Sequence, residues 1–273
     1  MCETRVGRSA SLFLWRDNIW FMAARISGAE STKVPSRSKI KSGHLFNFVI
    51  SLSSMRKELS KSYEYIEKIS PVESATKQQA RRLADQLGLG GISLSSVEAN
   101  LLRFLCRQVQ AEKILEIGTL TGLSALYLLE NANENVELWT LEKSQDHAAM
   151  AAEVLKDYIQ KERCHLLVGD AREELKKLEN KIQLDVVFID GNKAAYGEYF
   201  DWAFRHVRVG GLIIADNVFL SGAVWGDETR QKFNPKQIGV LQNLNSSALN
   251  NDKLLSVIVP TEEGLLVCQK LSS

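Results

Sequence analysis

Two carboxylates, an amide and a lysine follow two neighbouring apolar runs in the second half of the chain. Asp190 comes directly after LDVVFI, with Lys193 three residues later, and Asp216-Asn217 comes directly after GGLIIA. If both runs are parallel strands, these side chains lie at one edge of a sheet. Oxygen ligands favour a hard cation such as Mg²⁺, and the absence of His and Cys at these positions argues against zinc. Each feature alone could be a helix cap or a turn, but together they favour a metal site.

A glycine-containing loop follows an earlier apolar run. The string ILEIGTLTGLS contributes five candidate binding residues: Glu116, Gly118, Thr121, Gly122 and Ser124. Glycine lets the backbone approach a ligand closely, and a following helix N-terminus offers N–H groups to an anion. The dinucleotide pattern GxGxxG is absent, so the spacing suits the methionine part of S-adenosylmethionine (SAM) better than a pyrophosphate. A plain strand-to-helix turn is the structural alternative.

Acidic residues also follow the next two apolar runs. Glu142 lies roughly 20 residues beyond the glycine loop, which is the usual place for a carboxylate that binds ribose hydroxyls. Gly169-Asp170-Ala171 follows the third run. Asp170 could bind the adenine amino group or cap the next helix. Acidic or glycine-containing residues at three successive strand ends favour a nucleotide-type cofactor site.

These sites require a sheet that brings the strand ends together. Apolar runs predict strands over residues 113–117, 137–141, 165–168, 184–189, 212–215, 253–259 and 265–269. Helical periodicity covers residues 55–69, 72–87, 95–109, 123–131, 145–160, 172–179, 195–207 and 236–247. The alternation predicts an α/β, Rossmann-like, doubly wound sheet covered on both faces. The turn-like PTEEG between the last two strands predicts a terminal hairpin, so the last strand should be antiparallel.

Composition and charge fit a globular enzyme. The 273 residues are 45% hydrophobic and 25% charged, which excludes a disordered or collagen-like chain. The net charge of +1 gives no support for nucleic acid or an anionic membrane as a partner. The cysteines are Cys2, Cys106, Cys164 and Cys268, and they form no CxxC pair. We therefore expect buried free thiols and a cytoplasmic location.

Residues 1–54 differ from the rest of the chain. They hold eight basic and three acidic residues, a net charge of +5, whereas residues 55–273 hold 26 and 30, a net charge of −4. Arg16 and Asp17 interrupt the apolar stretch at residues 11–24, which is also too short to cross a membrane. We expect a basic leader over residues 1–54, disordered or extraneous, before a catalytic domain over residues 55–273 that begins near Met55. An organelle transit peptide is the alternative.

The combined motifs resemble a known family. The strings LEIGTLTGLS, FIDGNKAAYGEY and GGLIIADNVFLSGAV, with Glu142 and Gly169-Asp170-Ala171, are similar to the cation-dependent O-methyltransferases. This family includes the catechol and caffeoyl-coenzyme A O-methyltransferases and their bacterial relatives. The resemblance covers about residues 55–270. It implies a class I SAM-dependent methyltransferase fold with seven strands, the last of them antiparallel, and a homodimer.

The resemblance also implies roles for individual residues. Asp190, Asp216 and Asn217 would bind Mg²⁺ or another divalent cation such as Ca²⁺ or Mn²⁺, and Asp190 would also contact SAM. Lys193 would be the catalytic base. Glu142 would hold the ribose of SAM. Ser124 would hold the carboxylate group of SAM.

The expected reaction is O-methylation of a vicinal diol. A diol that chelates a cation becomes more acidic, and Lys193 could take its proton. Tyr196, Phe219 and Trp225 are candidates for an aromatic wall around the acceptor, although simple core packing is an equal explanation. Relatives often carry Trp at the position of Leu220, so the identity of the acceptor is open.

Other functions receive less support. A SAM-dependent methyltransferase with a non-catechol acceptor remains the nearest alternative. N-methyltransferases that act on nucleic acid or protein commonly need a Pro-Pro loop, and the prolines here are isolated: Pro35, Pro71, Pro235 and Pro260. A nicotinamide-dependent oxidoreductase would need GxGxxG or Tyr-x-x-x-Lys, which the sequence lacks. The complete metal-ligand set with Lys193 disfavours a non-catalytic SAM-binding protein.

Overall fold

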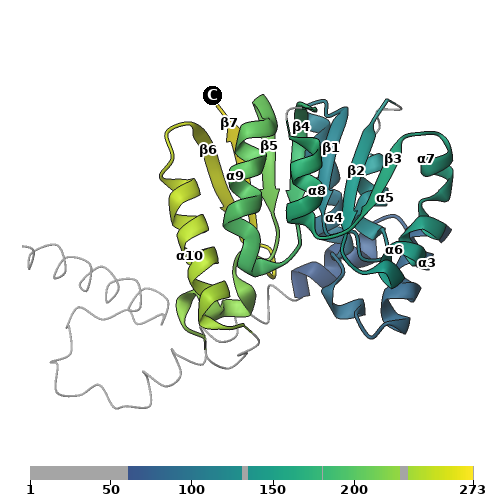
Figure 1. Ribbon diagram of the computed structural model, residues 1–273. Helices are drawn as coiled ribbons and strands as arrows, with labels where there is room; N and C mark the ends of the chain where they lie inside the picture. Colours follow the sequence, from purple (N-terminus) through teal and green to yellow (C-terminus); the bar gives the residue numbers. More distant parts are fainter. Residues whose placement is uncertain (1–60, 131–134, 180, 228–232, 273) are drawn as a thin grey trace, which may run out of the picture. The chain divides into compact units, whose positions relative to one another are not determined.

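Seven strands form one sheet in the order β3-β2-β1-β4-β5-β7-β6 (Figure 1). The computed structural model describes residues 61–130, 135–179, 181–227 and 233–272. The strands are β1 Lys113–Ile117, β2 Glu137–Glu142, β3 Cys164–Val168, β4 Leu184–Ile189, β5 Val207–Ala215, β6 Leu254–Val259 and β7 Leu265–Lys270. Strands β1 to β5 are parallel, and β7 is antiparallel to both β5 and β6. The prediction of a reversed last strand is confirmed.

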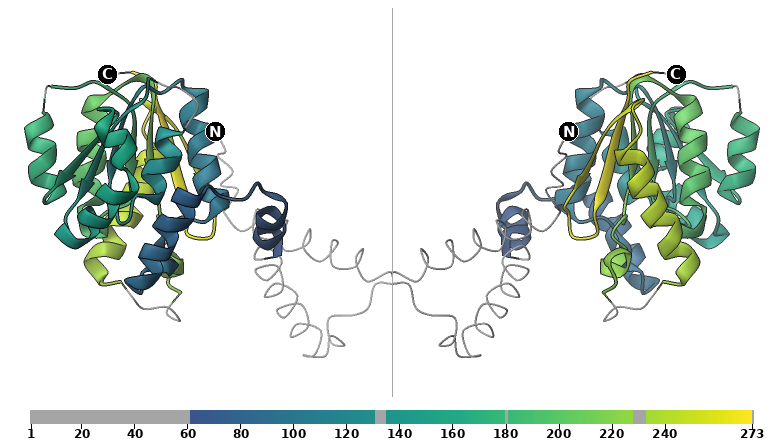
Figure 2. Two further views of the ribbon diagram at one scale, coloured as in Figure 1. Left: turned by 90° about the vertical axis from the view of Figure 1, so that its right-hand side faces the viewer. Right: turned by 90° about the vertical axis from the view of Figure 1, so that its left-hand side faces the viewer.

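Helices cover both faces of the sheet, as Figures 1 and 2 show. On one face lie α8 Ala171–Leu178, α9 Tyr196–His206 and α10 Pro235–Leu249. The other face is covered by α3 Ala75–Gln86, α4 Ser96–Gln108, α5 Leu123–Leu129 and α6 Gln145–Val154. The short helix α7 Lys156–Gln160 leads into β3, and residues 61–69 are also helical. The 3₁₀ turns are η2 Gly90–Ile92, η3 Lys193–Ala195 and η4 Leu220–Trp225. This is the doubly wound α/β fold that the sequence predicts.

Polar side chains set where the helices begin. Ser95 and Glu98 form a capping box at the start of α4, in which each side chain bonds the backbone of the other. Ser144 accepts from the backbone N–H of His147 at the start of α6. Asp170 accepts from the backbone N–H of Arg172 at the start of α8. Because α6 and α8 begin directly after β2 and β3, their capping residues also lie at the strand ends.

Most element ends lie within about three residues of the sequence prediction, and two differences are larger. The helix predicted over residues 145–160 is divided at Leu155, where the backbone leaves helical geometry (φ −94°, ψ 3°). Strand β5 begins at Val207, before the predicted start at residue 212. The prediction missed this part of the strand because Arg208 and two glycines interrupt the apolar pattern that marks a buried strand. The predicted leader over residues 1–54 and the start of the helix predicted from residue 55 lie outside the described residues.

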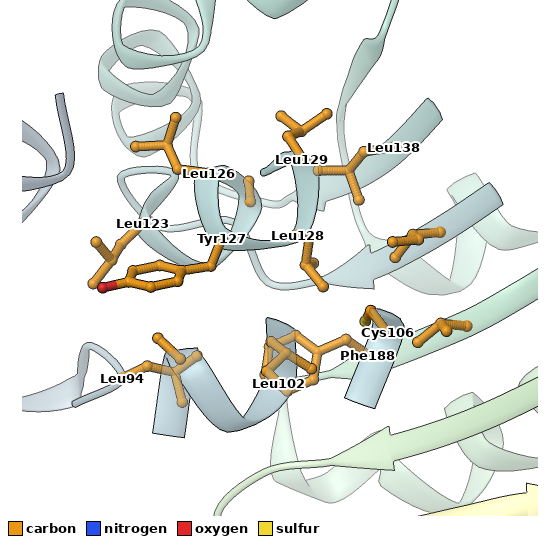
Figure 3. Packing of buried hydrophobic residues seen from close by; sticks show 14 of the residues in the cluster. Leu94, Leu102, Cys106, Leu123, Leu126, Tyr127, Leu128, Leu129, Leu138 and Phe188 are labelled. Carbon is orange, nitrogen blue, oxygen red and sulfur yellow. The ribbon is translucent and has the colours of Figure 1, made fainter. Parts of the chain in front are cut away.

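The sheet separates two hydrophobic clusters. In β4, Val186 and Phe188 pack on one side while Val187 and Ile189 pack on the other, and all four are fully buried. This explains why residues 186–189 of β4 read as a continuous apolar run rather than an alternating one. Figure 3 shows Phe188 within the cluster that also contains residues of α4 and α5.

Cys106, Cys164 and Cys268 are buried free thiols, as predicted. Within the part of the chain that the structure describes, no helix combines the length and apolar character needed to cross a membrane.

Replacing Phe188 by Ala should destabilise the fold strongly. The side chain is fully buried at the centre of the sheet, so its removal leaves a cavity that costs about 3–5 kcal/mol in the free energy of unfolding. Denaturant-induced unfolding measures this loss. Val209→Ala is the control, since that side chain is 51% exposed and its truncation should change stability by less than about 0.5 kcal/mol. Equal stability of the two variants would contradict the described core.

Candidate functional site

The carboxyl ends of the parallel strands stop in register. Ile117 of β1 is aligned with Leu141 of β2 and with Ile189 of β4, and Ile189 is aligned with Ala215 of β5. The next residue of each strand is therefore brought to the same edge, which lies at the bottom of the sheet in Figure 1. These following residues are Glu142, Gly118, Asp190 and Asp216, all of them predicted from the sequence.

A cavity of about 730 Å³ lies at this edge. At one end it is lined by predicted cofactor residues: Gly118, Thr121, Ser124, Glu142, Gly169, Asp170 and Ala171. At the other end it is lined by the predicted metal ligands and base: Asp190, Lys193, Asp216 and Asn217. The cavity is large enough for a cofactor and a small acceptor. Glu116 and Gly122 are predicted site residues that do not line it.

Gly118 allows the first and fourth strand ends to meet. Its φ is +105°, and a Cβ atom at this position would lie 2.2 Å from the carbonyl oxygen of Asp190. Any side chain would therefore push apart the two loops that carry the predicted cofactor and metal residues. The sequence motif singles out this glycine, and the structure adds that its neighbour is the Asp190 backbone.

Glu116 lies beneath the glycine loop, fully buried. The Thr140 hydroxyl donates to its Oε2 at 2.5 Å, and the Thr119 and Thr140 hydroxyls are themselves 2.5 Å apart. Burial, together with the negative charges of Asp190 and Glu142, raises the pKa of Glu116 to about 7, although hydrogen bonds from neighbouring hydroxyls oppose the shift. Glu116 is therefore linked to the glycine loop through the hydroxyls of Thr140 and Thr119.

Glu142 is fixed by backbone donors. Its Oε2 accepts from the N–H of Leu120 at 2.8 Å, and its Oε1 accepts from the N–H of Ser144 at 2.8 Å. The ring nitrogen Nδ1 of His147 lies 3.6 Å from Oε1. These contacts tie the carboxylate to the glycine loop and to the start of α6. The sequence prediction missed Leu120 and His147, although both also line the cavity.

Asp170 is a helix cap that also lines the cavity. It caps α8 by accepting from the N–H of Arg172 at 3.1 Å, and it lines the cavity. Lys143 donates to its other oxygen at 3.1 Å. The hydrogen bond from Lys143, together with the backbone bond from Arg172, lowers the pKa of Asp170 below its usual value.

At the end of the cavity with the predicted metal ligands, three side-chain oxygens surround the nitrogen of Lys193. Lys193 Nζ donates to Asp190 Oδ1 at 2.9 Å, to Asn217 Oδ1 at 2.6 Å and to the Tyr196 hydroxyl at 2.6 Å. Two of the three predicted metal ligands thus already share a single cationic partner. The lysine predicted as the base therefore contacts the oxygens of two side chains predicted as metal ligands.

Asp216 is the most buried carboxylate of this group, at 3% exposure. It accepts from the backbone N–H of Asn217 at 2.7 Å and from the Asn217 side chain at 3.2 Å. Burial raises the pKa of Asp216 well above its usual range, the charge of Asp190 raises it further, and Lys193 lowers it only in part.

The predicted ligands offer the oxygen donors that a hard cation prefers, although they do not form a cluster of His, Cys, Asp and Glu side chains. Among the residues that the structure describes, no group of three or more His, Cys, Asp and Glu side chains could hold a metal ion. The predicted set instead contains two carboxylates and the amide oxygen of Asn217. Such oxygen donors suit Mg²⁺, which keeps several positions for water or substrate.

The three candidates for an aromatic wall are not among the residues that line the cavity. Tyr196 is fully buried, and its hydroxyl contacts the carbonyl oxygen of Asp216 at 3.0 Å, so it supports the site from the core. The rings of Phe219 and Trp225 stack edge to face at 5.2 Å, and neither side chain lines the cavity. Tyr196 begins the buried face of α9, which continues with Tyr199, Phe200 and Ala203 at helical spacing.

Several cavity residues were not identified from the sequence: Glu98, Ser221, Phe233, Glu262 and Glu263. Glu98 carries a local signal, the Ser-x-x-Glu capping box. Glu262 and Glu263 belong to the β6–β7 turn, far along the chain from the strand ends. No sequence pattern marks them as part of the site.

Comparison with known proteins gives a consistent family. The O-methyltransferase family profile matches residues 67–271. A catechol O-methyltransferase of Niastella koreensis is 35% identical over 148 residues, covering 54% of this chain and 67% of the relative. A catechol O-methyltransferase of Mycobacterium tuberculosis is 34% identical over 141 residues, covering 52% of this chain but only 64% of that protein.

A solved structure agrees in fold and cofactor. The O-methyltransferase TomG from Streptomyces achromogenes, crystallised in complex with SAM, is 25% identical with a TM-score of 0.69. The match covers 78% of this chain and 96% of that one. Since the family profile runs from the first described helix to the end of β7, the chain belongs to the O-methyltransferase family and is a SAM-dependent O-methyltransferase.

Proposed function

We propose that the enzyme methylates one hydroxyl of a vicinal diol of the catechol type, held by a divalent cation. One observation carries this proposal: Asp190, Asp216, Asn217 and Lys193 meet at the end of a cavity whose other end has the predicted SAM residues. The two curated relatives named above are catechol O-methyltransferases, which supports the same acceptor class.

The cofactor end would bind SAM through residues that differ in role. Glu142 would accept the ribose hydroxyls, since its carboxylate faces the cavity while backbone donors hold it in place. Ser124, in the first turn of α5, would bind the carboxylate group of the methionine moiety. Asp170 would lie near the adenine. The close contact at Gly118 would bring the methyl group toward Asp190.

The acceptor end would bind the cation through Asp190, Asp216 and Asn217. A bound Mg²⁺, Ca²⁺ or Mn²⁺ makes a diol hydroxyl more acidic by stabilising its oxyanion. The raised pKa of Asp216 supports this assignment, because added positive charge would offset the repulsion between the two carboxylates.

Lys193 would accept the proton of the reacting hydroxyl. Its nitrogen lies at the cavity wall, within 2.9 Å of Asp190 Oδ1, and the buried Tyr196 hydroxyl holds it from the core side. A base fixed in this way is positioned before the acceptor arrives. Well-oriented reacting groups can contribute about 7–11 kcal/mol to catalysis.

Methyl transfer to a panel of catechols should require the divalent cation. EDTA should abolish activity, and excess Mg²⁺ should restore it. Asp190→Ala should lower kcat/KM by at least about 100-fold, because the charge stabilisation from a bound cation amounts to several kcal/mol. The matched control is Asp252→Asn, an exposed carboxylate before β6, at the opposite edge of the sheet. Full activity in EDTA would refute the cation-dependent reaction.

Lys193→Met should reduce kcat by about 10²–10⁴-fold while SAM still binds, because general base catalysis contributes on this scale. Lys193→Arg should not restore activity, since a guanidinium does not lose its proton in proteins. Steady-state kinetics and SAM titration calorimetry separate the two effects. Lys176→Met, at a side chain that is 71% exposed on α8, is the control. Retention of wild-type kcat by Lys193→Met would exclude the assigned role.

Gly118→Ala should abolish detectable SAM binding in titration calorimetry. The added Cβ would lie 2.2 Å from the Asp190 carbonyl oxygen, and the φ of +105° is strained for alanine. Gly239→Ala in α10 is the control, since its Cβ would meet no atom within 4 Å and alanine favours a helix. Wild-type affinity in Gly118→Ala would mean that the loop does not contact the cofactor.

A further inference from the structure

The loop after β5 contains an unusual number of left-handed residues. Positive φ values occur at Asn217 (55°), Leu220 (49°), Ser221 (52°), Gly222 (95°) and Gly226 (84°). Three of these residues are not glycine, and L-amino acids other than Asn and Asp rarely adopt this conformation. Something outside the loop must therefore hold it.

The β6–β7 turn supplies that restraint. The backbone N–H of Phe219 donates to the carbonyl oxygen of Glu263 at 2.9 Å. The Glu263 carboxylate then accepts twice from Ser221: its Oε2 from the backbone N–H at 2.8 Å, and its Oε1 from the hydroxyl at 2.9 Å. Glu263 thus bonds the loop on both sides of the left-handed residue Leu220.

Packing brings the turn close to the loop. Val218 donates its N–H to the carbonyl oxygen of Gly264 at 3.1 Å. A Cβ at Gly264 would lie 2.6–2.8 Å from the ring carbons of Phe219, so only glycine fits between the turn and this ring. The turn and the loop are therefore a single packed unit at the cavity edge.

This unit is continuous with the proposed cation site. Asn217 is both a left-handed residue of the loop and one of the proposed ligands, and its amide oxygen is 2.6 Å from Lys193 Nζ. Ser221 and Glu263 line the same cavity as Asp190. A shift of the loop at Ser221 would consequently turn the Asn217 amide oxygen away from the other ligands.

We propose that Glu263 is a positioning residue for the cation site. By holding Ser221 in the left-handed conformation, its carboxylate fixes the loop that directs the Asn217 oxygen toward Asp190. This inference rests on the proposed function, because it requires that the site binds a divalent cation. Glu263 acts through Ser221 and does not itself need to contact the cation or the acceptor.

The neighbouring Glu262 provides a matched control. It belongs to the same turn and lines the same cavity, but its side chain is exposed and the structure gives it no hydrogen bond to the loop. Glu262→Gln and Glu263→Gln remove the same charge at adjacent positions. Only Glu263→Gln replaces an oxygen that accepts from Ser221 with an NH₂ group, which cannot accept.

The test measures Mn²⁺ binding by electron paramagnetic resonance, with the full chain and SAM present. We expect Glu263→Gln to weaken Mn²⁺ binding at least 5-fold while SAM affinity changes less than 2-fold. Glu262→Gln should stay within 2-fold of the wild type in both measurements. Glu263→Gln with lowered thermal stability but wild-type Mn²⁺ affinity would overturn the proposal, because the residue would then be only structural.

A second variant tests the physical cause. Glycine adopts left-handed backbone conformations without strain, so Ser221→Gly in the Glu263→Gln background should regain most of the lost Mn²⁺ affinity. Failure of this rescue would contradict a role through the backbone of Ser221. If the wild-type chain binds no Mn²⁺, both the proposed cation dependence and this inference are wrong. Mn²⁺ binding unaffected by Glu263→Gln overturns the inference alone.

Discussion

The site depends on a row of backbone hydrogen bonds that extends the sheet one residue beyond the strand ends. Gly118 donates to Leu141, Asp190 donates to Ile117, and Asp216 donates to Ile189, each at 2.9 Å. Side chains alternate between the faces of a strand, so a slip of one residue would move every polar group out of the cavity. The buried apolar residues on both faces of β1 and β4 prevent that slip. The packing of the core therefore also fixes the positions of the polar groups in the site.

The same edge concentrates negative charge. Glu116 and Asp216 are almost without exposure, and burial together with neighbouring carboxylates raises the pKa of both. Two buried carboxylates at one edge of the sheet cost electrostatic free energy, and positive charge would offset that cost. Two ligands of the proposed reaction would bring positive charge: the sulfonium group of SAM and the divalent cation.

Some of this could be read from the sequence and some could not. Asp190 and Asp216 were predictable because each directly follows an uninterrupted apolar run, and the ends of parallel strands share one edge. The inward direction of Tyr196 was predictable as well, because this residue begins the buried apolar face of α9 at helical spacing. The start of β5 was missed because Arg208 is polar, although it pairs with Asp185 beside it. The contact of Glu263 with Ser221 joins distant segments and leaves no local pattern.

The reversal of β7 explains how that distant contact arises. In the antiparallel pairing Ala215, the last residue of β5, is aligned with Leu266 near the start of β7. The turn that precedes β7 therefore lies at the carboxyl edge of β5, beside Asp216 and the loop that follows it. A parallel strand in this place would begin at the opposite edge and would carry its preceding turn away from the cavity. The one strand that breaks the parallel pattern is thus the one that brings Glu263 to the proposed cation site.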